Sequence, residues 1–315
     1  MARFLLTILL TACGGGESVD FRSSCLPRDL SAPQVLYDCK GSEISDFDVN
    51  SDEVGWVVLN STTHASYNGV GRFGNCTGTL IEPKVTSATT PAYVLTNGHC
   101  LGDLLDPSGV FYDVETSKTM TFQYFLDLSQ SSRLVFSSKI ARVASMDNTD
   151  LALVELEATL SEVKAQGIAS YSIASYAPTE GRAIKLIGVP LSGVSSSLIG
   201  LRGSSCVVGA NVSLREGDYS FGNSYRVRCS IVGGNSGSPI FDKSTGEIVM
   251  LANTTVTDAS SSKSSCALDR PCEVSAGGTV VNEKDNYGQA TYILSGCFDS
   301  NGFFDKSQAT CVIAK

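Results

Sequence analysis

The stretch from residue 233 to residue 239 is GGNSGSP, which places Ser236 in a glycine-rich turn. Several backbone N–H groups of such a turn can converge on one point beside the serine hydroxyl. Upstream, residues 96–100 are TNGHC, so that His99 follows the apolar run 92–95 and directly precedes a cysteine. A serine hydroxyl is a weak nucleophile until an imidazole accepts its proton. The two segments therefore predict a nucleophile, a base and an oxyanion hole for acyl transfer.

A third segment, residues 148–156 (NTDLALVEL), places Asp150 before an alternating apolar run that is typical of a strand. A carboxylate at that point can hold one imidazole nitrogen as a donor and stabilise the imidazolium that forms. Asp147 and Asp127 are alternatives for this role, since each lies near a strand-like segment. The position of Asp150 at the start of the TDLALV run favours it over both.

The base and the nucleophile also have alternatives. The chain has two histidines, and His64 lies in a polar stretch with no partner motif, which favours His99. Ser236 alone can be an ordinary turn serine, because Gly-Asn-Ser-Gly is common turn chemistry. An α/β-hydrolase elbow, G-x-S-x-G, does not fit, because its fifth position here is Ser238 and no histidine follows position 99.

Together with residues 76–81 (CTGTLI), these segments resemble the chymotrypsin-like (trypsin-fold) serine proteases, in the order histidine, aspartate, serine. The resemblance implies an all-β fold of two antiparallel six-stranded β-barrels with the triad at their junction. It places His99 and Asp150 on the first barrel and Ser236 on the second. The backbone N–H groups of Gly234 and Ser236 would then form the oxyanion hole.

The nucleophile motif departs from the family's usual G-D-S-G-G-P at Asn235 and Ser238. GNSGSP is more similar to the V8-like, glutamyl-endopeptidase branch of bacterial members. In trypsin-type zymogens the aspartate pairs with a newly cut N-terminal amine. Asn235 has no charge for that pairing, so we do not expect activation by insertion of the N-terminus. Asn97, where the family more often has alanine, is a further departure.

The same resemblance bears on the substrate pocket. Ser230 lies where trypsins have their pocket-floor aspartate, so a basic P1 residue lacks its counter-charge. Glutamyl endopeptidases bind an acidic P1 residue partly through a histidine after the serine, and this chain has none there. The strand-like run 247–253, which includes Ala252, is predicted to form one pocket wall. We expect a small or apolar P1 residue.

The composition also indicates an all-β chain. The sequence has 30 glycines, and residues 151–156, 183–189, 248–252 and 290–294 have the length and apolar content of strands. A short helix is expected at residues 160–165.

The formal net charge of −9 argues against nucleic-acid binding, because no basic stripe is present to meet phosphates. The absence of C-x-x-C and the scarcity of histidine argue against a zinc site. We expect no metal and no cofactor, protein or peptide substrates, and a monomer.

Residues 1–12 resemble a signal peptide, with an apolar core at 4–10 that is too short to span a bilayer. The segment LTAC ending at Cys13 matches a bacterial lipobox, in which the cysteine becomes the lipid-modified first residue. An ordinary signal peptide cut elsewhere is the alternative. The sequence thus predicts export to the bacterial cell envelope or cell surface as a lipoprotein, or secretion, with membrane contact only through Cys13.

Apart from Cys13, the chain has an even number of cysteines, which in an exported protein suggests up to five disulfides. The family resemblance supports Cys76–Cys100, which would fasten the histidine loop. For the rest, pairing of nearest neighbours is the simplest hypothesis and gives Cys25–Cys39, Cys206–Cys229, Cys266–Cys272 and Cys297–Cys311.

The predicted organisation has four parts. They are a signal peptide (1–12), a tether or N-terminal extension (13–50), a protease domain (51–295) and a C-terminal disulfide loop (296–315) treated as an appendage. Within the protease domain, the first barrel is expected at about 51–165 and the second at about 175–295, with the link near 158–180.

Two functions are compatible with these residues. The first is an extracytoplasmic serine endopeptidase that works through His99, Asp150 and Ser236 and an acyl-enzyme intermediate. The alternative is a catalytically inactive protease-like surface binding module, favoured by Asn97, Asn235 and the cysteine loops at both ends. The presence of all three triad residues favours the enzyme.

Overall fold

The computed structural model describes residues 54–102, 109–256, 266–283 and 285–313, and a strand pair formed by β1 (Leu36–Tyr37) and β2 (Glu43–Ile44). The predicted signal peptide, the lipid-modified Cys13 and the Cys25–Cys39 disulfide lie outside the described residues. Their predictions therefore stay as they are.

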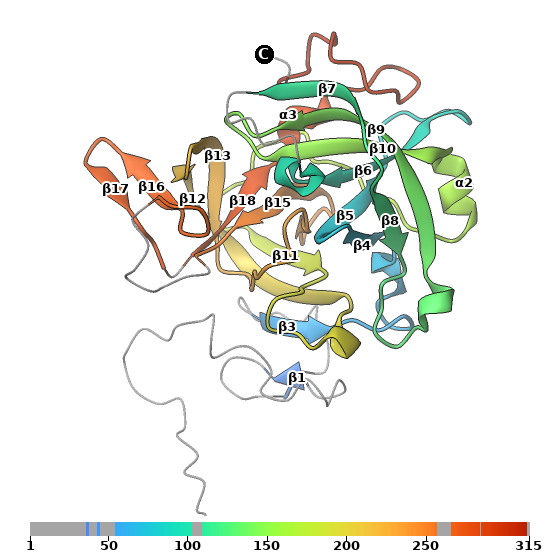
Figure 1. Cartoon of the computed structure of the whole chain (residues 1–315), viewed down its shortest axis with the longest axis horizontal. Helices are drawn as coiled ribbons and strands as arrows, with labels where there is room; N and C mark the ends of the chain where they lie inside the picture. Colours follow the sequence, from blue (N-terminus) through green and yellow to red (C-terminus); the bar gives the residue numbers. More distant parts are fainter. Residues whose placement is uncertain are drawn as a thin grey trace, which may run out of the picture.

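The first barrel is a closed ring of six antiparallel strands in the order β10-β6-β5-β4-β8-β9, completed by pairing of β9 with β10 (Figure 1). A seventh strand, β7, extends the sheet beyond β9. The strands are β4 (Val70–Phe73), β5 (Cys76–Ile81), β6 (Pro91–Thr96), β7 (Val110–Glu115), β8 (Thr119–Phe122), β9 (Leu134–Ser145) and β10 (Leu151–Thr159).

The second barrel is also a closed six-stranded ring, in the order β11-β14-β15-β18-β13-β12, completed by pairing of β11 with β12. A hairpin of β16 and β17 extends from β12 and projects from the body of the molecule (Figure 1). The strands are β11 (Ala183–Gly188), β12 (Arg202–Glu216), β13 (Tyr219–Val227), β14 (Pro239–Asp242), β15 (Ile248–Thr254), β16 (Cys272–Ser275), β17 (Gly278–Val280) and β18 (Asn286–Ala290).

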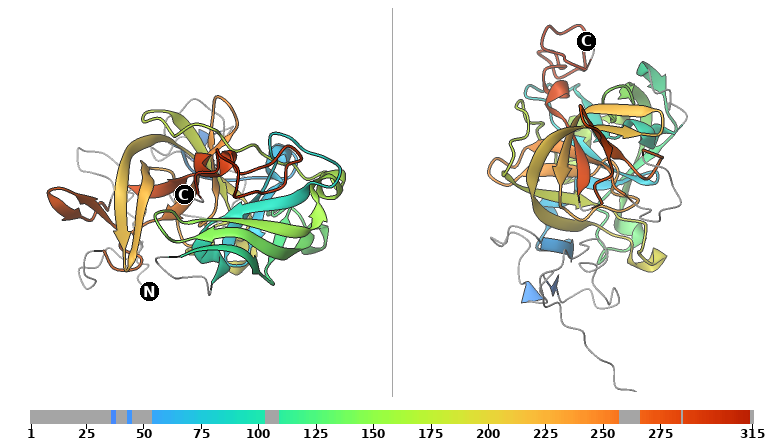
Figure 2. Two further views of the ribbon diagram at one scale, coloured as in Figure 1. Left: turned by 90° about the horizontal axis from the view of Figure 1, so that it is seen from above. Right: turned by 90° about the vertical axis from the view of Figure 1, so that its left-hand side faces the viewer.

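The predicted fold, all-β with two antiparallel six-stranded barrels, is confirmed by these two rings. Figure 2 shows the barrels side by side. One hydrophobic cluster spans the junction: Leu95 and Leu153 of the first barrel pack in the same core as Ile187, Phe241 and Leu251 of the second. Burial of this shared apolar surface holds the barrels together and fixes the seam between them.

One strand lies on the other side of the seam from its predicted place. The first barrel was expected to begin at about residue 51, yet β3 (Val54–Val58) pairs with β12 of the second barrel. The indole N–H of Trp56 donates to the carbonyl of Ser230, at 3.0 Å, also in the second barrel. The chain thus runs from β3 on the second barrel to β4 on the first.

The local predictions for strands and helix hold with one exception. β10, β11 and β15 cover the runs expected to be strands, and α2 (Leu160–Ala165) is the expected helix. Thr159 and Glu162 form a capping box at its N-terminus, in which each side chain satisfies the other's backbone N–H. Within the described residues, no helix has the length and apolar character needed to cross a bilayer.

The exception is the run from 290 to 294, which was expected to be a strand. β18 ends at Ala290, and Tyr292–Ser295 form the short helix α3. Ile293 and Leu294 are buried on that helical turn. A short apolar run fits a buried strand and a buried helical turn equally well, so its pattern does not distinguish them.

Four predicted disulfides are present: Cys76–Cys100, Cys206–Cys229, Cys266–Cys272 and Cys297–Cys311. The first joins β5 to the short 3-10 helix η2 (Gly98–Leu101), which carries His99. The second joins β12 to the segment after β13. Nearest-neighbour pairing is thereby confirmed for every predicted pair within the described residues.

The C-terminal disulfide loop is not the appendage that the sequence suggested. Cys297 and Cys311 are fully buried in the junction cluster. The backbone N–H of Phe304 donates to the hydroxyl of Tyr93 on β6, at 3.0 Å, and Lys306 lies 4.2 Å from the ring centre of Tyr112 on β7. The loop, dark red at the top of Figure 1, therefore fastens the end of the second barrel to the first.

The Tyr93→Phe substitution tests this attachment. It removes the acceptor for Phe304 N–H and should lower the free energy of unfolding by about 1–3 kcal/mol, measured by urea denaturation. Tyr176→Phe is the matched control, because Tyr176 is exposed and its hydroxyl bonds the side chains of Thr245 and Glu247 at the surface, and we expect a change within about 0.5 kcal/mol. Equal free energies of unfolding for the two variants would contradict the conclusion that the C-terminal loop fastens the two barrels through Tyr93.

Candidate active site

His99 is positioned by the tight turn that follows β6. Asn97 is extended and its side-chain amide donates to the backbone carbonyl of Asp150, at 2.6 Å. Gly98 allows the next close approach, since a Cβ there would lie 2.2 Å from the carbonyl oxygen of Ser145. The chain then enters η2, with Cys100 tied to β5 by its disulfide. Asn97, where the family more often has alanine, thus stabilises this turn by bonding it to the backbone at Asp150.

Asp150 holds the imidazole from behind. Its Oδ2 lies 2.6 Å from His99 Nδ1, and its Oδ1 accepts the backbone N–H of His99 at 3.0 Å. The carboxylate side chain is 1% exposed, whereas the imidazole is 34% exposed. A buried carboxylate bonded to Nδ1 keeps the proton on that nitrogen and leaves Nε2 free to act as a base.

The pKa of His99 is raised above its usual value of 6.5. Burial lowers the pKa, but the negative charge of Asp150, the hydrogen bond to it and the charge of Glu216 together outweigh burial. The imidazolium is therefore stabilised in place, as a general base requires once it has taken a proton.

Ser236 comes from the second barrel but is held by the first. Thr77 on β5 donates its backbone N–H to the carbonyl of Ser236, at 2.8 Å, and its hydroxyl to the carbonyl of Gly234, at 2.9 Å. The same hydroxyl accepts the N–H of Val189, at 3.0 Å. At Gly237, with φ of +79°, a Cβ would lie 2.3 Å from Thr77 O. The nucleophile turn is thus locked across the seam.

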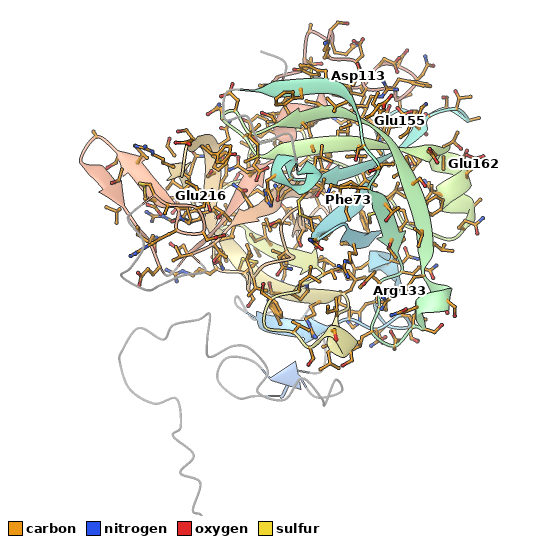
Figure 3. The ribbon with its side chains drawn as sticks, in the orientation of Figure 1. Phe73, Asp113, Arg133, Glu155, Glu162 and Glu216 are labelled. Atoms are coloured by element: carbon orange, nitrogen blue, oxygen red, sulfur yellow. A yellow bond between two sulfur atoms is a disulfide. The ribbon has the colours of Figure 1, made fainter. Side chains whose placement is uncertain are left out.

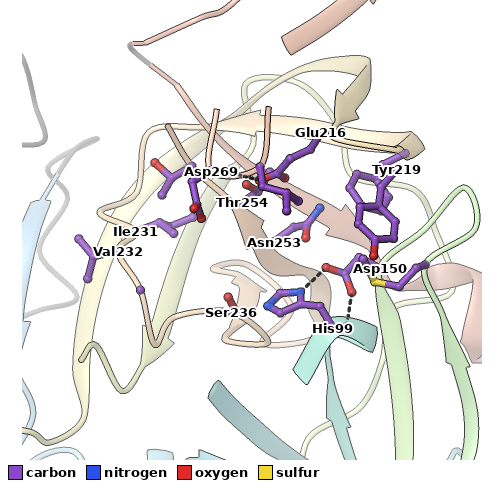
Figure 4. A pocket seen from close by; sticks show the side chains of 15 residues that line it. His99, Asp150, Glu216, Tyr219, Ile231, Val232, Ser236, Asn253, Thr254 and Asp269 are labelled. Atoms are coloured by element: carbon purple, nitrogen blue, oxygen red, sulfur yellow. Dashed lines mark hydrogen bonds and ion pairs between the residues drawn. The ribbon is translucent and has the colours of Figure 1, made fainter. Parts of the chain in front are cut away.

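The hydroxyl of Ser236 and the imidazole of His99 line the same pocket and face each other in Figure 4. Within the described part of the chain, no hydrogen bond joins them. Catalytic hydrogen bonds are often long before substrate binds and tighten in the complex. The structure therefore brings all three predicted triad residues to one place, with the bond between His99 and Asp150 already formed.

Two amide groups beside Ser236 are available as donors. In the part of the chain that the structure describes, no hydrogen bond engages the backbone N–H of Gly234 or of Ser236. Gly234 has φ of +100°, and a Cβ there would lie 2.6 Å from Leu191 N and 2.7 Å from Val189 O. Only glycine fits this position. These are the two N–H groups that the sequence predicts for the oxyanion hole, and that role stays a prediction.

Asn235 is satisfied within its own turn. It is 1% exposed, its side-chain oxygen accepts the N–H of Val232 at 3.1 Å, and its own N–H donates to the carbonyl of Val232 at 3.0 Å. The carboxamide thus braces the turn with neutral hydrogen bonds. The expectation that no N-terminal amine is needed to order this turn stays a prediction.

A family model described as the trypsin-like peptidase domain matches residues 76–250, which include His99, Asp150 and Ser236. This chain belongs to the trypsin-like peptidase domain family.

Solved structures similar to this trypsin-like peptidase include a Glu endopeptidase at 20% identity, covering 77% of this chain and 92% of that chain with a TM-score of 0.48. A thermostable serine protease from an extremophilic microorganism has 17% identity, coverage of 72% and 92%, and a TM-score of 0.47. The protease Anisep from Arthrobacter nicotinovorans has 16% identity, coverage of 72% and 93%, and a TM-score of 0.45. No curated protein sequence matches this one.

The alternative site residues of this trypsin-like peptidase are used elsewhere. His64 caps a short 3-10 helix, η1 (Ala65–Tyr67), and its Nδ1 accepts the N–H of Asn60 at 3.2 Å. The carboxylate of Asp127 accepts the N–H and the hydroxyl of Ser61. Neither residue lines the pocket that His99, Asp150 and Ser236 line.

The substrate pocket is a cavity of about 250 Å³ that opens beside the triad. Ser230 and Ala252, the two predicted pocket residues, are not in its lining. The backbone N–H of Ser230 donates to the Ser204 hydroxyl, at 3.2 Å, and Ala252 is fully buried in the β15 ladder. Their neighbours in sequence line the cavity instead: Ile231, Val232, Asn253 and Thr254.

Sequence reasoning missed the opposite wall. Glu216 and Tyr219 come from the turn between β12 and β13, and Asp269 from the loop closed by the Cys266–Cys272 disulfide (Figure 4). No motif marks these positions. Glu216 precedes a glycine, which indicates a hairpin turn. This pattern does not indicate which part of the molecule the turn contacts.

The cluster of Cys76, His99 and Cys100 is the one group of potential metal ligands found among the described residues. The two sulfurs are joined in a disulfide, so neither is a thiolate. Metal binding by cysteine requires the thiolate, and the cluster is therefore not a metal centre.

The raised pKa of His99 predicts the acid limb of the pH profile. The base must be neutral, so kcat/KM should fall as pH drops through an apparent pKa above 6.5. Asp150→Asn removes the largest raising contribution and the correct tautomer, and should lower kcat by about 10⁴-fold. The profile is measured with a fluorogenic peptide. A wild-type acid limb below 6.5 would contradict the assigned pairing.

Thr77→Val tests the lock across the seam. It leaves the Gly234 carbonyl and the Val189 N–H without their partner, and the displaced turn should lose roughly 10²-fold in kcat. Thr79→Val is the control, because the hydroxyl of Thr79, also buried on β5, has no hydrogen-bond partner among the described residues. We expect the control to keep full activity and stability. If Thr77→Val did the same, Thr77 would not position the nucleophile.

Proposed function

We propose that the chain is an extracytoplasmic serine endopeptidase that acts through His99, Asp150 and Ser236. The observation that carries this proposal is the buried Asp150–His99 pair whose imidazole faces Ser236 beside the amide groups of Gly234 and Ser236. Membership of the trypsin-like peptidase domain family supports it.

In this mechanism the peptide carbonyl lies over the turn that carries Ser236. His99 Nε2 takes the hydroxyl proton as Ser236 Oγ attacks the carbonyl carbon, and the N–H groups of Gly234 and Ser236 donate to the oxyanion. Asp150 stabilises the imidazolium, which then gives its proton to the leaving amine. Water attacks the acyl-enzyme by the same route, with His99 again as base, and releases the new carboxylate and Ser236.

Export is supported by the four disulfides, which form and persist in oxidising compartments. The lipobox ending at Cys13 supports anchorage at the cell envelope or surface through a lipid, with secretion as the alternative. The apolar side chains of Ile231 and Val232 beside Ser236 support a small or apolar P1 residue.

The decisive test compares wild type with Ser236→Ala on casein and with a fluorophosphonate label, using mature chain with its disulfides formed. Loss of a nucleophile of this kind costs on the order of 10⁶-fold in kcat, so no cleavage or labelling is expected. The control is Ser131→Ala, because Ser131 is exposed and does not line the pocket. This variant should behave as wild type.

The same experiment separates the alternative function. A correctly folded wild-type chain that neither cleaves casein nor reacts with the phosphonate would favour the inactive surface binding module. Labelling of a serine other than Ser236 would overturn the assigned nucleophile.

A further inference from the structure

The pocket wall opposite Ile231 and Val232 carries a carboxylate that the mechanism does not use. Glu216 ends β12, near the β16–β17 hairpin (Figure 3), and its side chain lines the cavity (Figure 4). Its Oε1 accepts the backbone N–H of Asp269 at 2.8 Å, and the Thr254 hydroxyl also donates to it. These bonds hold the carboxylate in place on the rim of the site.

Among the described residues, no lysine or arginine pairs with the carboxylate of Glu216. Its hydrogen bonds come from a neutral amide and a neutral hydroxyl, and no lysine or arginine is among the described residues that line the pocket. Glu155, a buried carboxylate on the first barrel, contrasts with it, because Lys139 and Arg142 both pair with Glu155. The described lining of the pocket thus presents the carboxylate of Glu216 with no lysine or arginine beside it.

A second, independent feature of the pocket also lacks a partner. Asn253 is 5% exposed, and its buried side-chain Nδ2 has no hydrogen-bond partner among the described residues. In the view of Figure 4, Asn253 lies between Glu216 and the His99–Asp150 pair. A buried donor without an acceptor costs free energy, and a ligand acceptor at that point would remove the cost.

These two groups define the chemistry of what binds. A cationic side chain satisfies Glu216, and a peptide carbonyl satisfies the donor of Asn253. A lysine or arginine residue of a peptide offers both. A carboxylate side chain would be repelled by Glu216 and gains no counter-charge in this wall.

We propose that Glu216 and Asn253 form a subsite that selects peptide substrates carrying lysine or arginine at a position other than the P1 residue. The proposal rests on the endopeptidase function. It assigns P1 to the apolar wall beside Ser236 and the cation to the wall across the cavity.

The subsite is tested with a set of fluorogenic peptides in which one lysine is moved through each position around a fixed small apolar P1 residue. Matched peptides have glutamine at the same place. Burial raises the pKa of Glu216, although its hydrogen bonds with Thr254 and the Asp269 N–H and the charge of His99 oppose this effect. Assays are therefore run at mildly alkaline pH, where the carboxylate is ionised. Wild type should prefer lysine over glutamine at one position by about 10- to 100-fold in kcat/KM.

Glu216→Gln should remove that preference, so that the variant cleaves the lysine and glutamine peptides with similar kcat/KM. Glu216→Lys should reverse it in favour of a glutamate peptide. Asp218→Asn is the matched control, since Asp218 is an exposed acid in the same hairpin turn that does not line the pocket, and it should keep the preference. Asn253→Leu should raise KM about tenfold for lysine and glutamine peptides alike.

The proposal is overturned if wild type shows no lysine preference at any position, or if Glu216→Gln keeps it. An unchanged KM in Asn253→Leu would remove Asn253 from the subsite. Fluorophosphonate titration of every variant separates these results from failure of the endopeptidase function, because an active nucleophile labels whether or not a cation is preferred.

Discussion

The hydrogen bonds of Thr77 are the constraint on which the site depends. Thr77 belongs to β5 of the first barrel, yet its backbone and hydroxyl hold the carbonyls of Ser236 and Gly234 in the second. It is fully buried, so these bonds are made away from competing water. The base and its orienting carboxylate lie on one barrel and the nucleophile on the other. The site therefore exists only when the barrels are docked in one register. When they are, the hydrogen bonds of Thr77 fix the position of the turn that carries Ser236.

Contacts within the first barrel and across the seam serve the same end. The Cys76–Cys100 disulfide fastens the histidine turn to β5, the strand that also carries Thr77. The C-terminal loop returns to the first barrel through Phe304 and Tyr93. The buried carboxylate of Asp150 is tolerable because His99 supplies two donors to it, one from the backbone and one from the ring. Rigid barrels thus carry short turns whose few polar groups are all directed at one point.

The sequence indicated the three residues that the structure brings together because each lies in a local pattern. A glycine-rich turn around Ser236, a histidine before a cysteine and an aspartate before a strand are all short patterns, and their order carries the family resemblance that implies the fold. The sequence did not reveal which side of the seam receives β3, because pairing of Val54–Val58 with β12 joins residues far apart along the chain. The same holds for the C-terminal loop. Glu216 was missed for a related reason: the tip of a long hairpin reaches the pocket only through the curvature of the second barrel. Ser230 and Ala252 were placed by analogy of spacing, whereas the lining residues are set by which side chains of the same segments face inward.

In the proposed subsite, Glu216 would also link substrate selection to the strength of the base. Its charge contributes to the raised pKa of His99, so in the free enzyme it favours the protonated imidazole, which cannot accept the proton of Ser236. A cationic substrate side chain bound to Glu216 opposes that contribution, since a positive charge near an imidazole lowers its pKa. The proposed ligand would therefore increase the fraction of neutral His99 at the moment when the base is needed. A neutral peptide in the same cavity would leave the field of Glu216 in place. In this proposal Glu216 favours cationic over neutral peptides in two ways: it binds the cation, and the bound cation lowers the pKa of His99. It does both without contacting either reacting atom.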